Sequence, residues 1–315
     1  MPNDDRIMHS AFRQTDRVRW YIDPATGAYV PVVRVDGGEV DLAAGAEVEL
    51  VDPTGVYLRD TTGANVGVKM IDGKLRTINQ PYLYAISEGD VADHYAVRRF
   101  GFNSDVGTSY ETVSYIGALM HYPAAALTLR VRSNDVDDDG DPADTGARTL
   151  WLQGLDANYA IQNETITMDG TTAVATSKAY IRLLKMKVVT AGTSLANEGT
   201  ITCYDNTNTF PIMAISPLTN ESHSASYTVP AGQTFYMTYW YGSEASLKGS
   251  RIQIFAQETF GELMALKRTL TVLDNVFTME MGIPMVFGEK TDIEVRAIAL
   301  AAGAIVSSGF VGWRE

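Results

Sequence analysis

The sequence predicts an all-β protein, an antiparallel β-sandwich of jelly-roll or Greek-key type. Apolar residues recur mostly at every second position, which is typical of strands with one buried face. Turn-forming residues, among them 27 Gly and 11 Pro, interrupt this pattern too often for long helices. The crossover helices that a parallel sheet requires are missing from the pattern, so the sheets are expected to be antiparallel.

The N-terminal region predicts a β-hairpin arm. Residues 18–22 and 28–33 have strand character, and they flank a turn in which Pro24 presets one dihedral angle and Gly27 can adopt a positive φ. Residues 1–78 contain many turns and few large apolar side chains, which indicates an arm or docking module rather than an independent core. The β-sandwich domain is expected to span residues 79–315.

Within this domain the period-two pattern repeats at intervals typical of a sandwich of two packed sheets. The predicted strands are 95–102, 112–120, 126–132, 148–154, 164–168, 179–189, 199–204, 210–215, 235–241, 251–257, 264–271, 276–281, 292–299 and 305–311.

Composition argues against several classes of function. The chain of 315 residues has 25 Lys and Arg against 38 Asp and Glu, a net charge of −13, so no nucleic-acid partner is expected. No run reaches the roughly 20 apolar residues of a membrane-spanning helix, so membrane insertion is not expected. The polar N-terminus lacks the apolar core of a secretory signal, which indicates maturation in the cytoplasm. The single cysteine, Cys203, lies in a strand pattern and is expected to be a small buried side chain.

The sequence offers no catalytic motif. It has no phosphate-binding loop, nucleophile elbow, Cys-x-x-Cys pair or His-Glu-x-x-His helix. Its four histidines, His9, His94, His121 and His223, are too far apart in the sequence to form a local metal motif. The protein is therefore expected not to be an enzyme, with no catalytic residues and no organic cofactor.

One acidic segment resembles half of a calcium-binding loop. Asp135, Asp137 and Asp139, followed by Gly140, place carboxylates at alternate positions before a residue that permits a sharp bend, and Asp144 adds a fourth carboxylate. Calcium is the one metal that this set predicts. The twelfth position is Gly146 where an EF-hand requires a bidentate Glu, so an EF-hand is excluded. A solvated acidic hairpin loop without a cation is the favoured alternative.

The strand predicted at 235–241 is the most aromatic in the chain. Strict alternation places Phe235, Met237, Tyr239 and Tyr241 on one face and Tyr236, Thr238 and Trp240 on the other. Aromatic side chains on both faces indicate packing in the core or against another subunit, and this is favoured over an exposed carbohydrate-binding surface. The candidate interaction residues are Tyr236, Tyr239 and Trp240.

Several segments between about residue 70 and the C-terminus are similar to uncharacterised virion structural proteins of tailed, often marine, bacteriophages. These segments are 73–76, 81–91, 100–103, 145–159, 164–172, 227–232 and 309–313. The resemblance implies a component of the virion, and it carries no catalytic residues. The first 70 residues lie outside it, as expected of an arm that varies with the surface it grips.

The sequence thus predicts a non-enzymatic virion structural protein that is assembled in the host cytoplasm. A capsid-associated decoration, vertex or head-fibre-base component that forms a homo-oligomer and docks on capsid or tail proteins is favoured. One alternative is a tail-attached receptor-binding protein for a host glycan. A second alternative is a polysaccharide depolymerase, which would be expected to show β-helix repeats that the sequence lacks.

Overall fold

The computed structural model describes residues 82–315 continuously and, before them, six short strands. The chain divides into two compact units, Met1–Gln80 and Pro81–Glu315. In the first unit, β1 (Arg19–Ile22) pairs with β2 (Tyr29–Val32), β3 (Leu58–Arg59) with β4 (Asn65–Val66), and β5 (Lys69–Ile71) with β6 (Lys74–Arg76). The first pair is the predicted hairpin, whose turn residues 23–28 lie outside the described residues. The role of this unit as an arm stays a prediction.

Helix α1 (Tyr82–Glu88) opens the second unit and was not predicted from the sequence. It ends at Glu88 and is followed by Gly89, whose φ of +80° is readily adopted only by glycine. The amide of Asp90 then donates to the carbonyl of Ala85, which closes the last turn.

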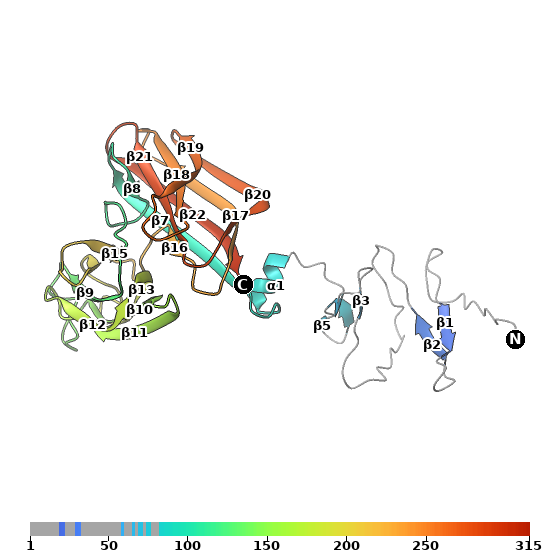
Figure 1. The fold of residues 1–315 in the computed structure, drawn as a ribbon. Helices are drawn as coiled ribbons and strands as arrows, with labels where there is room; N and C mark the ends of the chain where they lie inside the picture. Colours follow the sequence, from blue (N-terminus) through green and yellow to red (C-terminus); the bar gives the residue numbers. More distant parts are fainter. Residues whose placement is uncertain are drawn as a thin grey trace, which may run out of the picture. The chain divides into compact units, whose positions relative to one another are not determined.

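One sandwich of the second unit is here called the body (Figure 1). It is made of β7 and β8 from the start of the unit and β16–β22 from its end. Its first sheet has the order β20 (Asn275–Phe287), β17 (Phe235–Glu244), β22 (Ala304–Arg314), β7 (Tyr95–Val106). Its second sheet has the order β16 (Ser226–Thr228), β21 (Asp292–Ala299), β18 (Ser250–Gln257), β19 (Ala265–Val272), and β8 (Glu111–Thr112) also pairs with β21.

The body is held together by apolar side chains that both sheets direct into the space between them. Phe235, Trp240 and Phe310 come from the first sheet, and Ile254 and Val295 from the second, and all are fully buried in one core cluster. Side chains of this size each contribute about 1.5–3 kcal/mol of hydrophobic free energy on burial. Because only one face of each strand points into this core, apolar residues recur at every second position, and the sequence pattern predicts these strands.

Pairing in the body is nested along the chain. The first strand, β7, pairs with the last, β22; β8 and β16 pair with β21; β17 pairs with β20; and β18 pairs with β19. Every one of these pairs is antiparallel. The body is thus a long antiparallel hairpin. Its first arm is β7, β8 with β16, β17 and β18, its second arm is β19–β22, and each arm contributes strands to both sheets.

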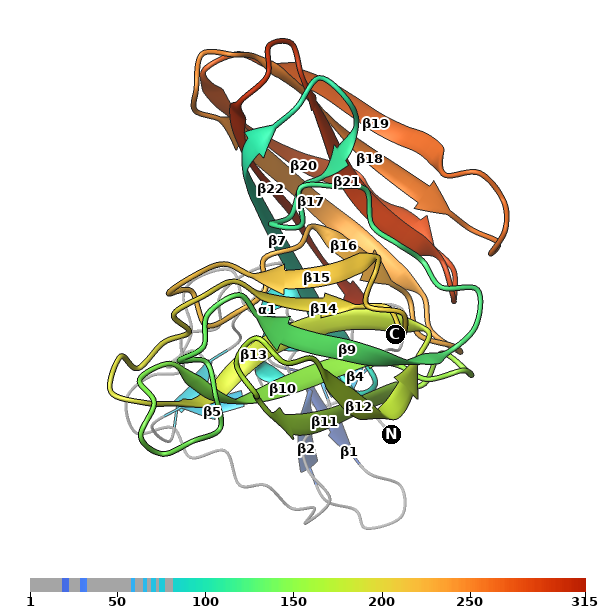
Figure 2. The ribbon, with the colours of Figure 1, turned by 90° about the vertical axis from the view of Figure 1, so that its left-hand side faces the viewer.

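A second sandwich, here called the insert and defined as residues 115–223, interrupts the body between β8 and β16 (Figure 2). One of its sheets has the order β11 (Ile161–Thr167), β10 (Ala147–Leu155), β13 (Arg182–Ala191). The other has the order β12 (Val174–Tyr180), β9 (Leu127–Ser133), β14 (Ile201–Tyr204), β15 (Pro211–Ile215). These sheets enclose their own core, which includes Leu150, Leu152 and Met186 and the fully buried Cys203. The expected burial of Cys203 is confirmed.

The chain leaves and re-enters the body at one point. Ser114 and Ser224 form an isolated antiparallel bridge at the root of the insert. Beside it, the amide of Ala225 donates to the carbonyl of Val113, and both residues hydrogen-bond to Val295 of β21. Because β8 and β16 lie along the same partner strand, they act as two halves of one body strand that the insert divides.

The prediction of antiparallel packed sheets is confirmed, but the domain 79–315 contains two hydrophobic cores where one sandwich was expected. Both sandwiches have the same period of two, so the sequence pattern holds no signal for the division between them. The strand predicted at 112–120 is wrong beyond Thr112, because the chain turns there into the insert.

Candidate interaction surface

A buried ion pair joins the insert to the body. Arg182, the first residue of β13, donates from Nε and Nη2 to the two carboxylate oxygens of Asp292 on β21, at 2.8 and 2.7 Å. Its Nη1 donates to the carbonyls of Pro123 and Ile181, and the hydroxyl of Thr228 donates to Asp292. The two charged side chains are only 3% and 1% exposed. A buried pair of this kind is stable only because its remaining polar atoms are also bonded.

Aromatic rings enclose the guanidinium group of Arg182. It lies 5.1, 5.7 and 5.3 Å from the ring centres of Tyr122, Tyr159 and Phe260, within range of cation–π attraction. Burial by itself would lower the pKa of Arg182, but the hydrogen bonds and charge of Asp292 outweigh it and raise that pKa. The guanidinium therefore remains charged.

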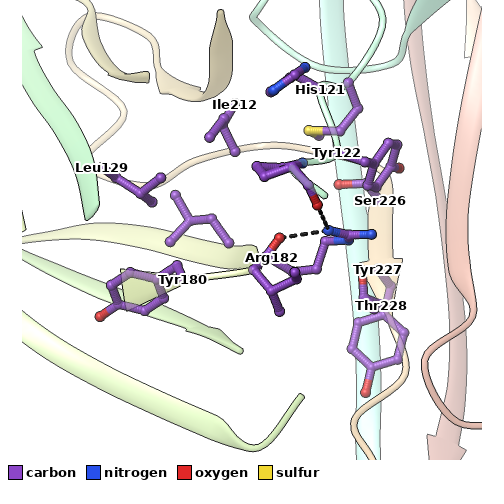
Figure 3. A pocket seen from close by; sticks show the side chains of 13 residues that line it. His121, Tyr122, Leu129, Tyr180, Arg182, Ile212, Ser226, Tyr227 and Thr228 are labelled. Atoms are coloured by element: carbon purple, nitrogen blue, oxygen red, sulfur yellow. Dashed lines mark hydrogen bonds between the residues drawn. The ribbon is translucent and has the colours of Figure 1, made fainter. Parts of the chain in front are cut away.

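A small pocket lies beside this ion pair (Figure 3). Leu129, Tyr180 and Ile212 of the insert line it together with Ser226 and Thr228 of the body. Its cavity volume is about 20 Å³, enough for one water molecule. Small-molecule sites are usually on the order of 300–1,000 Å³, so this pocket is part of the packing between the two sandwiches.

A second buried acid, Glu294, lies two residues after Asp292 on β21. Glu294 of β21 accepts a hydrogen bond from the hydroxyl of Thr112 on β8 and, at 2.8 Å, from Arg296. Tyr122 also donates to Glu294, at 3.4 Å. Burial, and then the nearby negative charge of Glu294, raise the pKa of Tyr122 well above its ordinary value. Tyr122 therefore remains a neutral donor, and the cluster fixes the root of the insert.

The acidic loop of the insert is organised around an aspartate that the sequence analysis did not single out. Asp138 is fully buried, and its carboxylate accepts hydrogen bonds from the hydroxyl of Ser133 and from the amides of Ala147, Glu198 and Gly199, at 2.5–2.9 Å. Four donors satisfy this charge without a cation. The loop therefore owes its shape to Asp138, the member of the acidic run that points inward.

The four aspartates predicted as calcium ligands lie in the same loop. Asp135 and Asp139 accept hydrogen bonds from the backbone amides two residues ahead. Desolvation and the charges of neighbouring aspartates, Asp139 first among them, raise the pKa of Asp144. No group of three or more His, Cys, Asp or Glu side chains in the described part of the chain is arranged to hold a metal ion. The calcium site stays a prediction.

The aromatic strand β17 departs from strict alternation. A β-bulge between Met237 and Tyr239 turns Trp240 inward, where it is fully buried and donates to the hydroxyl of Ser308. The inclusion of Trp240 among the interaction residues is therefore wrong, because its ring lies inside the body. The same bulge places Tyr236, Tyr239 and Tyr241 together on the opposite side.

That opposite side, here called the outer face, is the surface of the sheet β20–β17–β22–β7 that points away from the body core. The strand registers arrange it in four rows across the sheet. In the order β20, β17, β22, β7 the rows are Val286–Tyr236–Trp313–Ala96, Glu280–Tyr239–Val311–Arg98, Thr278–Tyr241–Gly309–Phe100 and Val276–Ser243–Ser307–Phe102. The face therefore has six aromatic side chains and only two charged ones.

Several side chains of the outer face are accessible to a partner. Val276 and Val286 on β20 are 65% and 58% exposed, and Phe100 on β7 is 42% exposed. The rings of Tyr236 and Trp313 are stacked with centres 5.0 Å apart. Tyr241 covers Gly309, since a side chain there would collide with its ring. An ordered apolar surface of this kind is typical of a protein–protein interface.

Among the described residues, no helix combines the length and the apolar character needed to cross a membrane.

We predict that Asp292→Asn lowers the free energy of unfolding by about 3–5 kcal/mol, because it leaves the buried charge of Arg182 uncompensated. The matched control, Glu221→Gln, breaks the partly exposed ion pair with Lys185 and should cost under about 1 kcal/mol. Urea unfolding measures both. Equal losses in the two variants would contradict the role of the Arg182–Asp292 pair.

We predict that Asp138→Asn lowers the free energy of unfolding by about 2–3 kcal/mol, since an amide cannot accept all the hydrogen bonds made to this buried carboxylate. Asp137→Asn, one residue away and exposed, is the control and should change stability little.

Thermal melts of the wild-type chain with calcium and with chelator test the calcium site. A calcium-dependent rise in Tm that disappears when Asp137 and Asp139 are both replaced with Asn would support it, and identical melts would refute it.

Comparisons with known proteins leave the family of the chain undetermined. No family model matches it, and no curated protein matches it with significance. Among solved structures, it is similar to a chain described as "Structure of infectious bursal disease virus Gt strain", with 10% identity over 75% of this chain and 87% of that chain. The TM-score of 0.13 does not show a shared fold.

Proposed function

We propose that the protein is a non-enzymatic structural component of a bacteriophage virion that self-associates and docks on the particle. The favoured position is a capsid-associated decoration, vertex or head-fibre base. The observation that carries the proposal is the nested pairing of the body, in which the first strand pairs with the last and each later pair lies inside the one before. This order supports a jelly roll, an architecture used by viral capsid domains and lectins.

Because one fold can host many functions, the surfaces of the molecule must support the proposal as well. The outer face of the body supports self-association. Its aromatic side chains are ordered by the sheet, so pairing with a partner would cost little conformational entropy. The insert projects from one divided strand of the body, an arrangement that leaves its loops available for contacts with other particle proteins.

Exposed leucines in strained positions support the docking part of the proposal. Leu195, Leu218 and Leu247 have φ values of 59°, 65° and 58°, and they are 79%, 67% and 71% exposed. The left-handed conformation costs a residue with a Cβ roughly 1–2 kcal/mol, and Gly or Asn would be favoured at such positions. Large apolar side chains at exposed, strained positions indicate selection for binding over stability.

The backbone around two of these leucines is firmly held. Asn197 and Asn220 exchange hydrogen bonds, each side-chain oxygen accepting from the other residue's amide at 3.0–3.1 Å. The side chain of Asn220 also donates to the carbonyl of Leu195, and the amide of Leu218 donates to the carbonyl of Asn197. The two loops are thereby joined, so both leucines are presented by a single preorganised part of the insert.

The third leucine lies at a tip of the body with a similar design. Glu244, which is 2% exposed, accepts hydrogen bonds from the amides of Ser246 and Asp274 and so joins two neighbouring turns. Although burial opposes ionisation, the hydrogen bond from the Ser246 hydroxyl, together with those from the amides, lowers the pKa of Glu244 to about 2. Leu273 and Leu300 lie over Gly249 at this tip, and both are more than half exposed. The tip therefore presents three ordered leucines.

The proposal predicts that the full chain forms a homo-oligomer or binds capsids or tails of the phage that encodes it. Light scattering after size-exclusion chromatography measures the first, and co-sedimentation with purified particles measures the second. An oligomer, or a stoichiometric particle-bound form, is the expected result. A strict monomer with no affinity for capsids or tails would contradict the proposal.

For docking, we predict that Leu195→Asn combined with Leu218→Asn raises the free energy of unfolding by about 1 kcal/mol through relief of backbone strain. The same variant should bind particles at least about tenfold more weakly, because two exposed leucines that become buried on binding contribute a few kcal/mol. Leu263→Asn is the control: this leucine is 93% exposed but has no positive φ, so neither quantity should change. Particle binding that survives the double substitution would refute docking through these loops.

A further inference from the structure

The two charges of the outer face lie in one row and are separated by its width. Glu280 on β20 and Arg98 on β7 lie at opposite ends of the row Glu280–Tyr239–Val311–Arg98. Neighbouring strands are about 4.8 Å apart, so roughly 14 Å separates the two backbone positions, too far for an ion pair. Both side chains are exposed, and neither forms an ion pair with any residue that the structure describes.

A two-fold axis can bring these charges together between two copies of the chain. An axis that runs parallel to the strands, between β17 and β22, places β20 opposite β7 of the second copy. Each row then faces the same row of the second copy, in reversed order of strands. Glu280 of each copy then faces Arg98 of the other, so the interface contains two equivalent ion pairs. Packed sheets are about 10 Å apart, a gap that these long side chains can span together.

The remaining rows are compatible with the same axis. In these rows Tyr236 faces Trp313 of the second copy, Tyr241 faces Gly309 and Val276 faces Phe102, while Phe100 faces the uncharged Thr278. Sheets that pack face to face normally cross at a small angle, about 30°, which preserves this order of rows. No two like charges are placed opposite each other anywhere on the face.

Another two-fold arrangement fits the charges poorly. An axis within the same plane but perpendicular to the strands, between the two middle rows, keeps each strand opposite itself and exchanges those rows. Glu280 would then face Thr278, and Arg98 would face Phe100, which leaves both charges in the interface without an opposite charge. Burial of an unpaired charge is costly, so this arrangement is disfavoured.

We infer that the partner of the outer face is a second copy of this chain, paired face to face about a two-fold axis parallel to the strands, with reciprocal Arg98–Glu280 ion pairs. The inference rests on the proposed self-association and names its surface and symmetry. The sixteen residues of the face approach the roughly 20–30 residues per partner of a standard interface. Apolar rows supply the affinity, and the charge pairs fix the orientation.

A charge-exchange experiment on the full chain tests the inference. Arg98→Glu and Glu280→Arg should each weaken dimerisation at least about tenfold, because each single variant places two pairs of like charges in the interface. The double variant, Arg98→Glu with Glu280→Arg, should return to within about threefold of the wild type. Analytical ultracentrifugation over a range of protein concentrations measures the dissociation constants, and Arg251→Glu, an exposed site on β18 of the other sheet, is the control for net charge.

Two results would overturn the inference. One is oligomerisation that is unchanged by both single substitutions, which leaves the proposed self-association intact and places it on another surface. The other is a double variant no better than the singles, which would show that Arg98 and Glu280 do not meet. Should one single variant fail to fold, the other single variant and the double variant still decide, since facing charges predict that the single weakens dimerisation and that the double restores it. A wild type that is monomeric at every concentration contradicts both this inference and the proposed self-association.

Discussion

The ion pair between Arg182 and Asp292 determines how the second unit is built, because it joins two sandwiches at a point shielded from bulk solvent. Asp292 opens β21, the strand along which β8 and β16 both lie. Arg182 opens β13 of the insert, and its guanidinium is enclosed by rings from three separate segments. A mobile insert would expose both charges to water, so the pairing favours one fixed attachment of the insert to the body.

This attachment leaves the central strands of the outer face available. The hydrogen bonds and ion pairs that hold the insert run through β21, β16 and the inward-facing Arg99 of β7, which donates to the carbonyl of Leu184. The central strands of the outer face, β17 and β22, take no part in these bonds, while Phe100 at its β7 edge packs edge-on against His223 of the insert, with ring centres 5.3 Å apart. One body can thus carry both an insert with strained, exposed leucines and an apolar sheet surface, as a protein that connects copies and docks on a particle requires.

The sequence predicts most strands because their alternation reflects burial on one face, as at β21, where the predicted and observed bounds agree. It fails where three-dimensional context overrides that period. The bulge beside Tyr239 moves Trp240 into the core, and nothing local distinguishes Trp240 from the tyrosines around it. The Arg182–Asp292 pair joins residues 110 positions apart, beyond the reach of any local pattern. Asp138 lies within an acidic run whose members look alike until the fold directs one of them inward.

The account depends most on the claim that the outer face is buried between copies of the chain. Cryo-electron microscopy of the assembled oligomer, free or on the particle, measures this directly. The account predicts two bodies related by a two-fold axis parallel to the strands, with Tyr239 and Val311 at the centre of the contact and Arg98 beside Glu280 of the neighbouring copy. An assembly in which the outer face is exposed to solvent, while another surface joins the copies, would contradict it.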